Sequence, residues 1–304
     1  MELGMVGLGK MGAYMTERLV RGGHRVVGYD RDAVVVKRVT DKGAAGADSL
    51  EKMVAELKTP RTVWLMVPAG APVDQTIDLL TPHLAPGDTI IDGGNSYYRD
   101  TVRRAAALTA KKLNYVDCGT SGGVWGLTEG YSMMVGGDAD VVKRLAPIFQ
   151  TLAPGPEKGW GRVGPSGSGH YVKMVHNGIE YGIMQAYAEG LDILRHKKEF
   201  GLDLLQISHI WQYGSVIRSW LLDLTADALE KNPTLEGVGG YVTDSGEGRW
   251  TAIEGIEMGV PVPTLIGALD ARFRSQDPEP FANKLLAMMR HEFGGHAVKS
   301  ASND

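Results

Sequence analysis

The stretch that organises the chain is GPSGSGHYVKMVHNGIEYGIMQAYAEGLDILRHK, residues 164–197. It opens with loop-forming residues and then contains no proline and many helix-forming residues, which predicts one long helix. In that helix Lys173, His176, Asn177 and Glu180 stand at i, i+3, i+4 and i+7, a spacing that places them on one face. Lys173 and Glu180 are then about 10 Å apart along the helix axis, at ~1.5 Å per residue. A base and an acid at that separation can act on opposite ends of a small substrate.

Two glycines, Gly178 and Gly182, interrupt this predicted helix. Each glycine in a helix interior costs about 1 kcal/mol relative to alanine, so the pair indicates that another segment packs closely against the helix. A solvated polar stripe would explain the same Lys/Glu face, and the pattern alone leaves both interpretations open. If the face is a functional site, its four polar residues are the first candidates for catalysis and binding.

Toward the N-terminus, a glycine-rich loop follows a short apolar run and precedes an amphipathic helix. The loop is GLGKMG at residues 7–12, and the run before it predicts a strand at Glu2–Val6. A second predicted strand, Arg25–Tyr29, ends at Asp30. This context is the dinucleotide-binding fingerprint, in which the glycines admit the pyrophosphate at a helix N-terminus and the acid accepts the ribose hydroxyls. Asp30 would repel the extra phosphate of NADP, so we expect NAD; a glycine turn without a ligand is the alternative.

Strands alternate with helices up to about residue 164. Further strands are expected at Thr62–Val67, Thr89–Asp92, Tyr115–Cys118 and Tyr131–Val135, and helices at Ala13–Val20, Val73–Leu84 and Asp100–Lys112. This alternation predicts a Rossmann-like α/β domain with a mostly parallel, doubly wound sheet over residues 1–164. Ligands of such sheets bind beyond the carboxyl ends of the strands, where the loops at Ala69, Asn95 and Ser121 also fall. The residues expected to bind the dinucleotide are Gly7, Leu8, Gly9, Met11, Gly12, Asp30, Arg31, Val67, Ala69 and Asn95.

Beyond residue 164 the strand-like runs nearly vanish and helical periodicity continues. Helices are expected at Leu202–Ala228, Thr251–Met258, Pro263–Ser275 and Pro280–His291. Residues 165–304 therefore form a predicted all-helical domain for substrate binding and dimerisation, with the Lys173 helix first and a polar, glycine-containing tail last. Taken alone, that tail would be a frayed terminus.

Composition excludes several classes of protein. The chain has 304 residues, a net charge of −4 and 43% hydrophobic residues, which predicts a globular protein with room for two domains and no basic footprint for nucleic acid. It has no apolar run long enough for a membrane span and no signal-peptide pattern. Its single cysteine, Cys118, fits the reducing cytoplasm and a core position, and no metal-ligand spacing is present.

The assembled motifs resemble the decarboxylating 6-phosphogluconate dehydrogenase family, in the short-chain branch of the β-hydroxyacid dehydrogenase group. The resemblance extends from Gly7 to His296. Its most specific motif is VKMVHNGIEYGIMQ at Val172–Gln185, where other β-hydroxyacid dehydrogenases follow the lysine with paired asparagines. The other motifs are IIDGGNSYYRDTVRR at Ile90–Arg104, the Ser121-Gly122-Gly123 loop, GRWTAIEGIEMGVPVP at Gly248–Pro263 and the FGGH tail.

The resemblance implies oxidative decarboxylation of 6-phosphogluconate to ribulose 5-phosphate and CO₂ with reduction of NAD, a step of the pentose phosphate pathway. It implies Lys173 as general base and Glu180 as general acid. The implied substrate-binding residues are Asn95, Ser121, Gly122, Gly123, His176, Asn177, Tyr181, Arg272, Arg290 and His296. In the family the last two reach a neighbouring subunit's phosphate pocket, so the resemblance implies a homodimer or homotetramer with a shared active site.

Two departures from the family pattern matter. Where the family has a lysine and a threonine that contact phosphate, this chain has Ser245 and Glu247, and Arg249 is near enough in sequence to substitute. Where NADP-using members have Asn-Arg-Thr, this chain has Asp30-Arg31-Asp32, which favours NAD while leaving NADP possible. Two other functions stay open: a dehydrogenase of a smaller β-hydroxyacid without phosphate, and a nucleotide-sensing protein without turnover.

Overall fold

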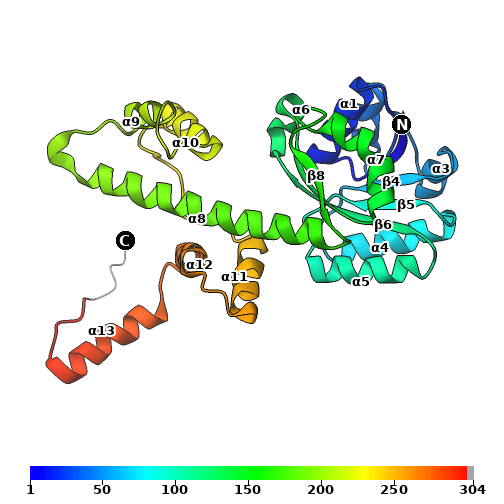
Figure 1. The fold of residues 1–304 in the computed structure, drawn as a ribbon. Helices are drawn as coiled ribbons and strands as arrows, with labels where there is room; N and C mark the ends of the chain where they lie inside the picture. The colour runs from blue at the N-terminus through cyan, green and yellow to red at the C-terminus, as the bar shows by residue number, and fades with distance from the viewer. Residues whose placement is uncertain (300–304) are drawn as a thin grey trace. The chain divides into compact units, whose positions relative to one another are not determined.

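A computed structural model of the chain describes residues 1–299 and divides it into two compact units (Figure 1). The first unit is Met1–Asn177 and the second begins at Gly178. This division falls inside a single helix, whereas the sequence predicts a domain boundary at residue 164, which stays a prediction.

The first unit contains an eight-stranded sheet with the order β3-β2-β1-β4-β5-β6-β7-β8. Strands β6 and β7 pair antiparallel, and the other neighbours pair parallel. The predicted Rossmann-like, mostly parallel sheet is therefore confirmed. The strands are β1 (Glu2–Val6), β2 (Arg25–Tyr29), β3 (Ala45–Gly46), β4 (Thr62–Leu65), β5 (Thr89–Asp92), β6 (Asn114–Ser121), β7 (Ser132–Gly136) and β8 (Trp160–Gly164).

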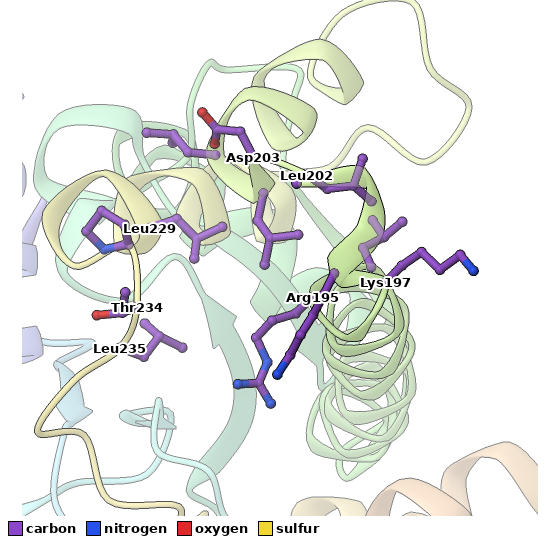
Figure 2. Close-up of a pocket in the computed structure, with 13 residues that line it drawn as sticks. Arg195, Lys197, Leu202, Asp203, Leu229, Thr234 and Leu235 are labelled. Atoms are coloured by element: carbon purple, nitrogen blue, oxygen red, sulfur yellow. The ribbon is translucent and has the colours of Figure 1, made fainter.

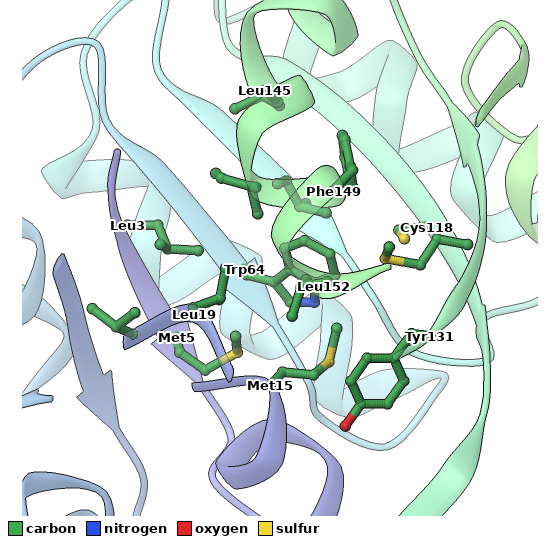
Figure 3. Packing of buried hydrophobic residues seen from close by; sticks show 14 of the residues in the cluster. Leu3, Met5, Met15, Leu19, Trp64, Cys118, Tyr131, Leu145, Phe149 and Leu152 are labelled. Carbon is green, nitrogen blue, oxygen red and sulfur yellow. The ribbon is translucent and has the colours of Figure 1, made fainter. Parts of the chain in front are cut away.

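Helices of this unit pack on both faces of the sheet, and strand alternation decides which face a residue meets. Trp64 and Ile91 join the core formed with α1 and α7, where Trp64 lies 5.9 Å from Phe149 between ring centroids (Figure 3). Their strand neighbours Val63 and Ile90 join the core formed with α3, α4 and α5. The helices are α1 (Lys10–Arg21), α2 (Ala33–Thr40), α3 (Leu50–Ala55), α4 (Ala71–Leu80), α5 (Tyr98–Thr109), α6 (Gly126–Glu129) and α7 (Ala139–Leu152), with short 3₁₀ turns at Thr81–His83 and Gly123–Trp125.

The predicted long helix is present as α8 (Ser168–His196), 29 residues without a break. It begins in the first unit and continues into the second. The remaining elements of the second unit are α9 (Leu204–Trp211), α10 (Trp220–Lys231), α11 (Glu247–Met258), α12 (Pro263–Gln276) and α13 (Phe281–Gly294), with a 3₁₀ turn at Lys198–Phe200. The unit is helical, as predicted.

The expectation of one helix over Leu202–Ala228 is wrong. The structure has α9 and α10 instead, separated by residues 212–219. Gly214 takes a positive φ of 74° in the connection, and Ser219 caps α10 by accepting a hydrogen bond from the backbone N–H of Leu222. A serine cap satisfies an N–H that the helix itself cannot, so it marks a true helix start.

Candidate active site

The glycine-rich loop between β1 and α1 leaves open space at a helix N-terminus. Gly7 has φ +89°, and a Cβ there would lie 2.4 Å from the carbonyl oxygen of Met66. A Cβ on Gly12 would lie 2.0 Å from the carbonyl oxygen of Gly7, whereas one on Gly9 would meet nothing within 4 Å. Gly9 also caps α1 without a side-chain hydrogen bond. A pyrophosphate fits this site, because the loop side is unobstructed and the first N–H groups of α1 have no side-chain acceptor.

Asp30, directly after β2, is fixed beside this loop. Its Oδ2 accepts a hydrogen bond from the backbone N–H of Leu8 at 2.7 Å, and its Oδ1 accepts one from that of Asp32 at 3.0 Å. A carboxylate has about four acceptor positions, so two remain for the hydroxyls of a ribose. Asp32 caps α2 through the backbone N–H of Val34, and Arg31 is exposed. Two carboxylates at the end of β2 disfavour an additional phosphate there.

The other predicted loops follow strands that are neighbours in the sheet. Val67 and Ala69 follow β4, Asn95 follows β5, and Ser121 ends β6. Because β1, β4, β5 and β6 run parallel side by side, their carboxyl ends share one edge. The structure thus brings together the loops that the sequence predicts as the rim of a site. Gly122 and Gly123, with φ of 129° and 49°, turn the chain sharply after β6.

Lys173 is buried against a glycine of β6. The residue is 6% exposed, and a Cβ on Gly119 would lie 2.4 Å from the Cβ of Lys173. The Nζ of Lys173 lies 3.4 Å from Nδ1 of His176, which in turn lies 3.0 Å from Oδ1 of Asn177. Three of the four residues predicted to share a helix face therefore form one connected polar group.

Asp117 of β6, which sequence reasoning missed, anchors the N-terminus of this helix. It is fully buried, and its two oxygens accept hydrogen bonds from the backbone N–H groups of Gly167 at 2.7 Å and His170 at 2.9 Å. A carboxylate at this position satisfies helix N–H groups and complements the helix dipole. The signal in the sequence was an acid inside an apolar strand. The next residue, Cys118, is in the core as predicted, and burial raises the pKa of its thiol to about 12.

The second unit holds a polar cluster around the buried Tyr181 of α8. The hydroxyl of Tyr181 lies 3.1 Å from Oγ of Ser245 and 3.3 Å from Oδ1 of Asp244. The guanidinium of Arg272 stacks on the Tyr181 ring at 3.5 Å from its centroid, and its buried Nε has no hydrogen-bond partner. A buried cation beside hydroxyls is suited to an anion such as phosphate.

Two carboxylates share this cluster. Oγ of Ser245 donates to Oε2 of Glu247 at 2.5 Å, and Glu247 is buried. Arg249 is paired with Asp244, with Nη2 to Oδ2 at 2.7 Å. The Arg249 charge, considered from the sequence as a substitute for the family's lysine, is therefore already engaged by a neighbouring carboxylate.

The remaining predicted residues lie on α8 and in the C-terminal tail. Glu180 is on α8, seven positions after Lys173, and is half-buried. Arg290 on α13 and His296 after it are exposed, and the carbonyl of His296 accepts from Nδ1 of His291 at 3.0 Å. Within the described residues, the second unit itself does not bury this tail.

A cavity of about 550 Å³ in the second unit contains none of the predicted site residues (Figure 2). It lies at the end of α8, with Leu202, Leu229 and Leu235 among its lining residues. Over residues 1–299, no three His, Cys, Asp or Glu side chains are grouped to hold a metal ion. In the same part of the chain, no helix has the length and apolar character that crossing a membrane requires.

Comparisons with known proteins cover nearly the whole chain. The model of the NAD-binding domain of 6-phosphogluconate dehydrogenase matches residues 2–161, and that of the C-terminal domain of the same enzyme matches residues 169–287. A relative from Haloferax volcanii, an NAD(+)-dependent decarboxylating 6-phosphogluconate dehydrogenase, is 45% identical over 299 residues, which is 98% of each chain.

Solved structures give the same result. The 6-phosphogluconate dehydrogenase of Plasmodium falciparum, solved in its apo form and in complex with NADP+ and with 6-phosphogluconate, is 30% identical with a TM-score of 0.84. The match covers 100% of this chain and 67% of that one. A 3-hydroxyisobutyrate dehydrogenase from Salmonella typhimurium, 22% identical with a TM-score of 0.74 over 91% of this chain and 95% of its own, shares the fold. The two matched domain models and the 45% identical relative show that this chain belongs to the 6-phosphogluconate dehydrogenase family.

Proposed function

We propose that the chain catalyses the NAD-dependent oxidative decarboxylation of 6-phosphogluconate to ribulose 5-phosphate and CO₂, as in the pentose phosphate pathway. The observation that carries this proposal is the buried position of Lys173. The residue is buried, and its Cβ packs against Gly119 of β6, a strand whose carboxyl end lies at the edge shared by the predicted cofactor and substrate loops. Its Nζ contacts His176, which contacts Asn177. Membership of the family and the name of the 45% identical relative support the same reaction.

In the first step Lys173 takes the proton from the hydroxyl on the carbon β to the substrate carboxylate. The bound oxidised nicotinamide supplies the acceptor for the hydride that leaves the same carbon. This step needs a neutral amine, as base catalysis near neutral pH requires. The product of this step is a β-keto acid.

In the second step the bond between the carboxylate carbon and the α-carbon breaks, and CO₂ leaves. The electron pair moves toward the keto oxygen, where the protonated Lys173 stabilises the developing enolate. Glu180, on the same helix, then donates a proton to the former α-carbon of the enediol, giving the ketose phosphate. Asn95, Ser121, Gly122, Gly123, His176 and Asn177 hold the carboxylate and hydroxyls in this proposal.

The phosphate contacts are proposed for Tyr181 and Arg272, with Arg290 and His296 supplied by a second copy of the chain. The stacked, buried guanidinium of Arg272, with its unpaired Nε, supports this assignment. Asp30 directs the choice toward NAD, with NADP as a poorer cofactor. We place the reaction in the cytoplasm.

A dehydrogenase for a smaller, non-phosphorylated β-hydroxyacid is the second candidate. It is favoured by Glu247, whose buried carboxylate would repel a phosphate dianion.

One substrate panel separates the two functions. Purified protein is given NAD with 6-phosphogluconate, gluconate or 3-hydroxyisobutyrate, while reduced nicotinamide and released CO₂ are both measured. Of the three substrates, we expect only 6-phosphogluconate to be turned over, with reduced nicotinamide and CO₂ formed in equal amounts. Faster turnover of 3-hydroxyisobutyrate without CO₂ would establish the second candidate instead.

A further inference from the structure

Asp92, the last residue of β5, ties down the loop that carries Asn95. The carboxylate is fully buried. Its Oδ1 accepts a hydrogen bond from the backbone N–H of Gly94 at 3.2 Å, and its Oδ2 accepts one from Oγ of Ser96 at 2.7 Å. The same Oδ2 accepts from the hydroxyl of Tyr115 at 2.8 Å. One carboxylate therefore holds the residues on both sides of Asn95.

Arg104 of α5 connects this loop to the loop after β4. Its Nε and Nη2 bind the two oxygens of Asp74 at 2.9 Å each, and Nη2 also donates to the carbonyl of Gly70 at 3.0 Å. Its Nη1 donates to Oγ of Ser96 at 3.4 Å and lies 3.7 Å from Oδ2 of Asp92. The planar guanidinium can reach all of these partners at once because its donors form a rigid fork, which a lysine lacks.

The charges of the network fix its protonation around neutral pH. Hydrogen bonding from Arg104 lowers the pKa of Asp74 to about 2. Burial, with Asp92 beside it, raises the pKa of Tyr115 well above its ordinary value, so the hydroxyl remains a donor. The buried Arg104 is therefore paired with carboxylates. An unpaired charge at this position would strongly destabilise the fold.

We propose that Asp92 and Arg104 are positioning residues that hold Asn95 and the Ala69–Gly70 loop in the geometry needed for cofactor and substrate. This inference rests on the proposed function, since that function makes the two loops part of the site. The network is placed next to both loops but touches neither ligand in this scheme. A displacement of about 1 Å at a reacting centre can cost on the order of 100-fold in rate, so tethering of this kind has a measurable consequence.

Arg103 provides a matched control. It is the preceding residue on α5 and also binds Asp74, with Nη2 to Oδ1 at 3.0 Å. Its side chain is 58% exposed, against 2% for Arg104, and it forms ion pairs with Asp74 and Asp100, which are both partly exposed. Arg103→Lys therefore weakens an ion pair between α5 and Asp74 of α4, but it leaves the hydrogen bonds that Asp92 and Arg104 make to the two loops unchanged.

The experiment compares Arg104→Lys, Ser96→Ala and Arg103→Lys with the unmodified protein. We would measure the Kd for NAD by calorimetric titration, kcat and KM for 6-phosphogluconate, and Tm. For Arg104→Lys we expect a Kd for NAD raised several-fold and kcat/KM lowered roughly 10- to 100-fold. For Ser96→Ala we expect a smaller change in the same direction with a smaller fall in Tm, because one hydrogen bond to the buried Asp92 is lost. For Arg103→Lys we expect values within about twofold of the unmodified protein.

Equal effects of Arg104→Lys and Arg103→Lys on Kd and kcat/KM would overturn the proposal, because the loss would then belong to the Asp74 ion pair. If Arg104→Lys does not fold, Ser96→Ala decides, since it removes one tether without burying an unpaired charge. Unchanged Kd, KM and kcat in that variant would also overturn the proposal. Failure of the unmodified protein to bind NAD or turn over 6-phosphogluconate would instead reject the proposed function.

Discussion

The two compact units bury their apolar side chains to very different extents. In the first unit, strands and helices fill two cores, one on each face of the sheet. In the second unit, the apolar cluster is small, with Tyr181, Ala252, Ala268 and Leu269 as its buried members. Helix α13 has no buried residue and exposes Phe281 by 75% and Phe293 by 78%.

This difference fits the proposal that the first unit is complete by itself, whereas the second buries its apolar side chains in an assembly. A helix of 14 residues such as α13 is marginally stable without tertiary contacts, even with good helix formers. A large exposed apolar surface marks an interaction site. We infer that a second copy of the chain covers it, as a two-fold symmetric dimer or a tetramer would allow.

The largest effect is expected for Lys173→Met in the first unit. Loss of a positioned base lowers kcat by roughly 10²–10⁴. The methionine can occupy the same apolar space on Gly119, so the Kd for NAD should remain unchanged. Steady-state kinetics and NAD titration on the same preparation measure both quantities. A rate near that of the unmodified protein would remove Lys173 from the mechanism.

The next effect concerns the exposed face of α13. Leu286 is 56% exposed on this helix, and Leu79 of α4 in the first unit is similarly exposed at 59%. We expect Leu286→Asp to raise the dissociation constant of the oligomer by about tenfold or more, since a buried charge opposes association. Leu79→Asp should have no effect on assembly. Light scattering over a concentration series measures the dissociation constant. Equal dissociation constants for the two variants would contradict the comparison.

Cofactor choice is a property of the first unit alone in this account. The unmodified protein should use NAD better than NADP. Asp30→Ser should lower the ratio of kcat/KM for NAD to that for NADP by about tenfold, because it removes a charge that repels the phosphate of NADP. Asp30 also accepts the backbone N–H of Leu8, so Asp30→Asn serves as a control that keeps an acceptor there. The ratio of kcat/KM for the two cofactors is the measurement. Better kinetics with NADP in the unmodified protein would refute our interpretation of Asp30.

The smallest effect tests the close packing under Lys173. A methyl group on Gly119 would lie 2.4 Å from the Cβ of Lys173, whereas one on Gly161 of β8 would meet nothing within 4 Å. Gly119→Ala should therefore cost about 1–3 kcal/mol of stability, and Gly161→Ala should cost little. Thermal denaturation of both variants measures the difference. A Tm for Gly119→Ala equal to that of Gly161→Ala would show that α8 does not pack closely against Gly119 at Lys173.

The sequence predicts the first unit well and the second less well for physical reasons. Strand β5 and the helix with Lys173 have strong local periodicity and loop signals, so both appear where expected. The break between α9 and α10 was missed because apolar residues continue through it and Gly214 is an isolated signal. Asp92 and Asp117 were missed because their partners are brought together only by the fold.

The arrangement of Ser245 and Glu247 could not have been predicted from spacing. Whether Glu247 faces solvent or the Tyr181 cluster depends on how α11 begins, and that is set by Gly246 at its N-cap with φ +106°. Similarly, the sequence places Arg249 near the phosphate contacts, but the structure pairs it with Asp244. Local sequence patterns thus indicate the candidate residues, but only the packed structure shows which of their charges are paired with one another.

The most direct test of the central claim is complementation between two inactive variants, Lys173→Met and the double change Arg290→Ala with His296→Ala. If a neighbour's tail completes each site, random co-assembly makes about half of the dimers mixed, and one of the two sites in each mixed dimer is intact. Activity should then recover to roughly a quarter of that of the unmodified protein, by the same symmetry. If each tail serves its own chain, no mixed dimer contains an intact site, and the mixture would stay as inactive as its components.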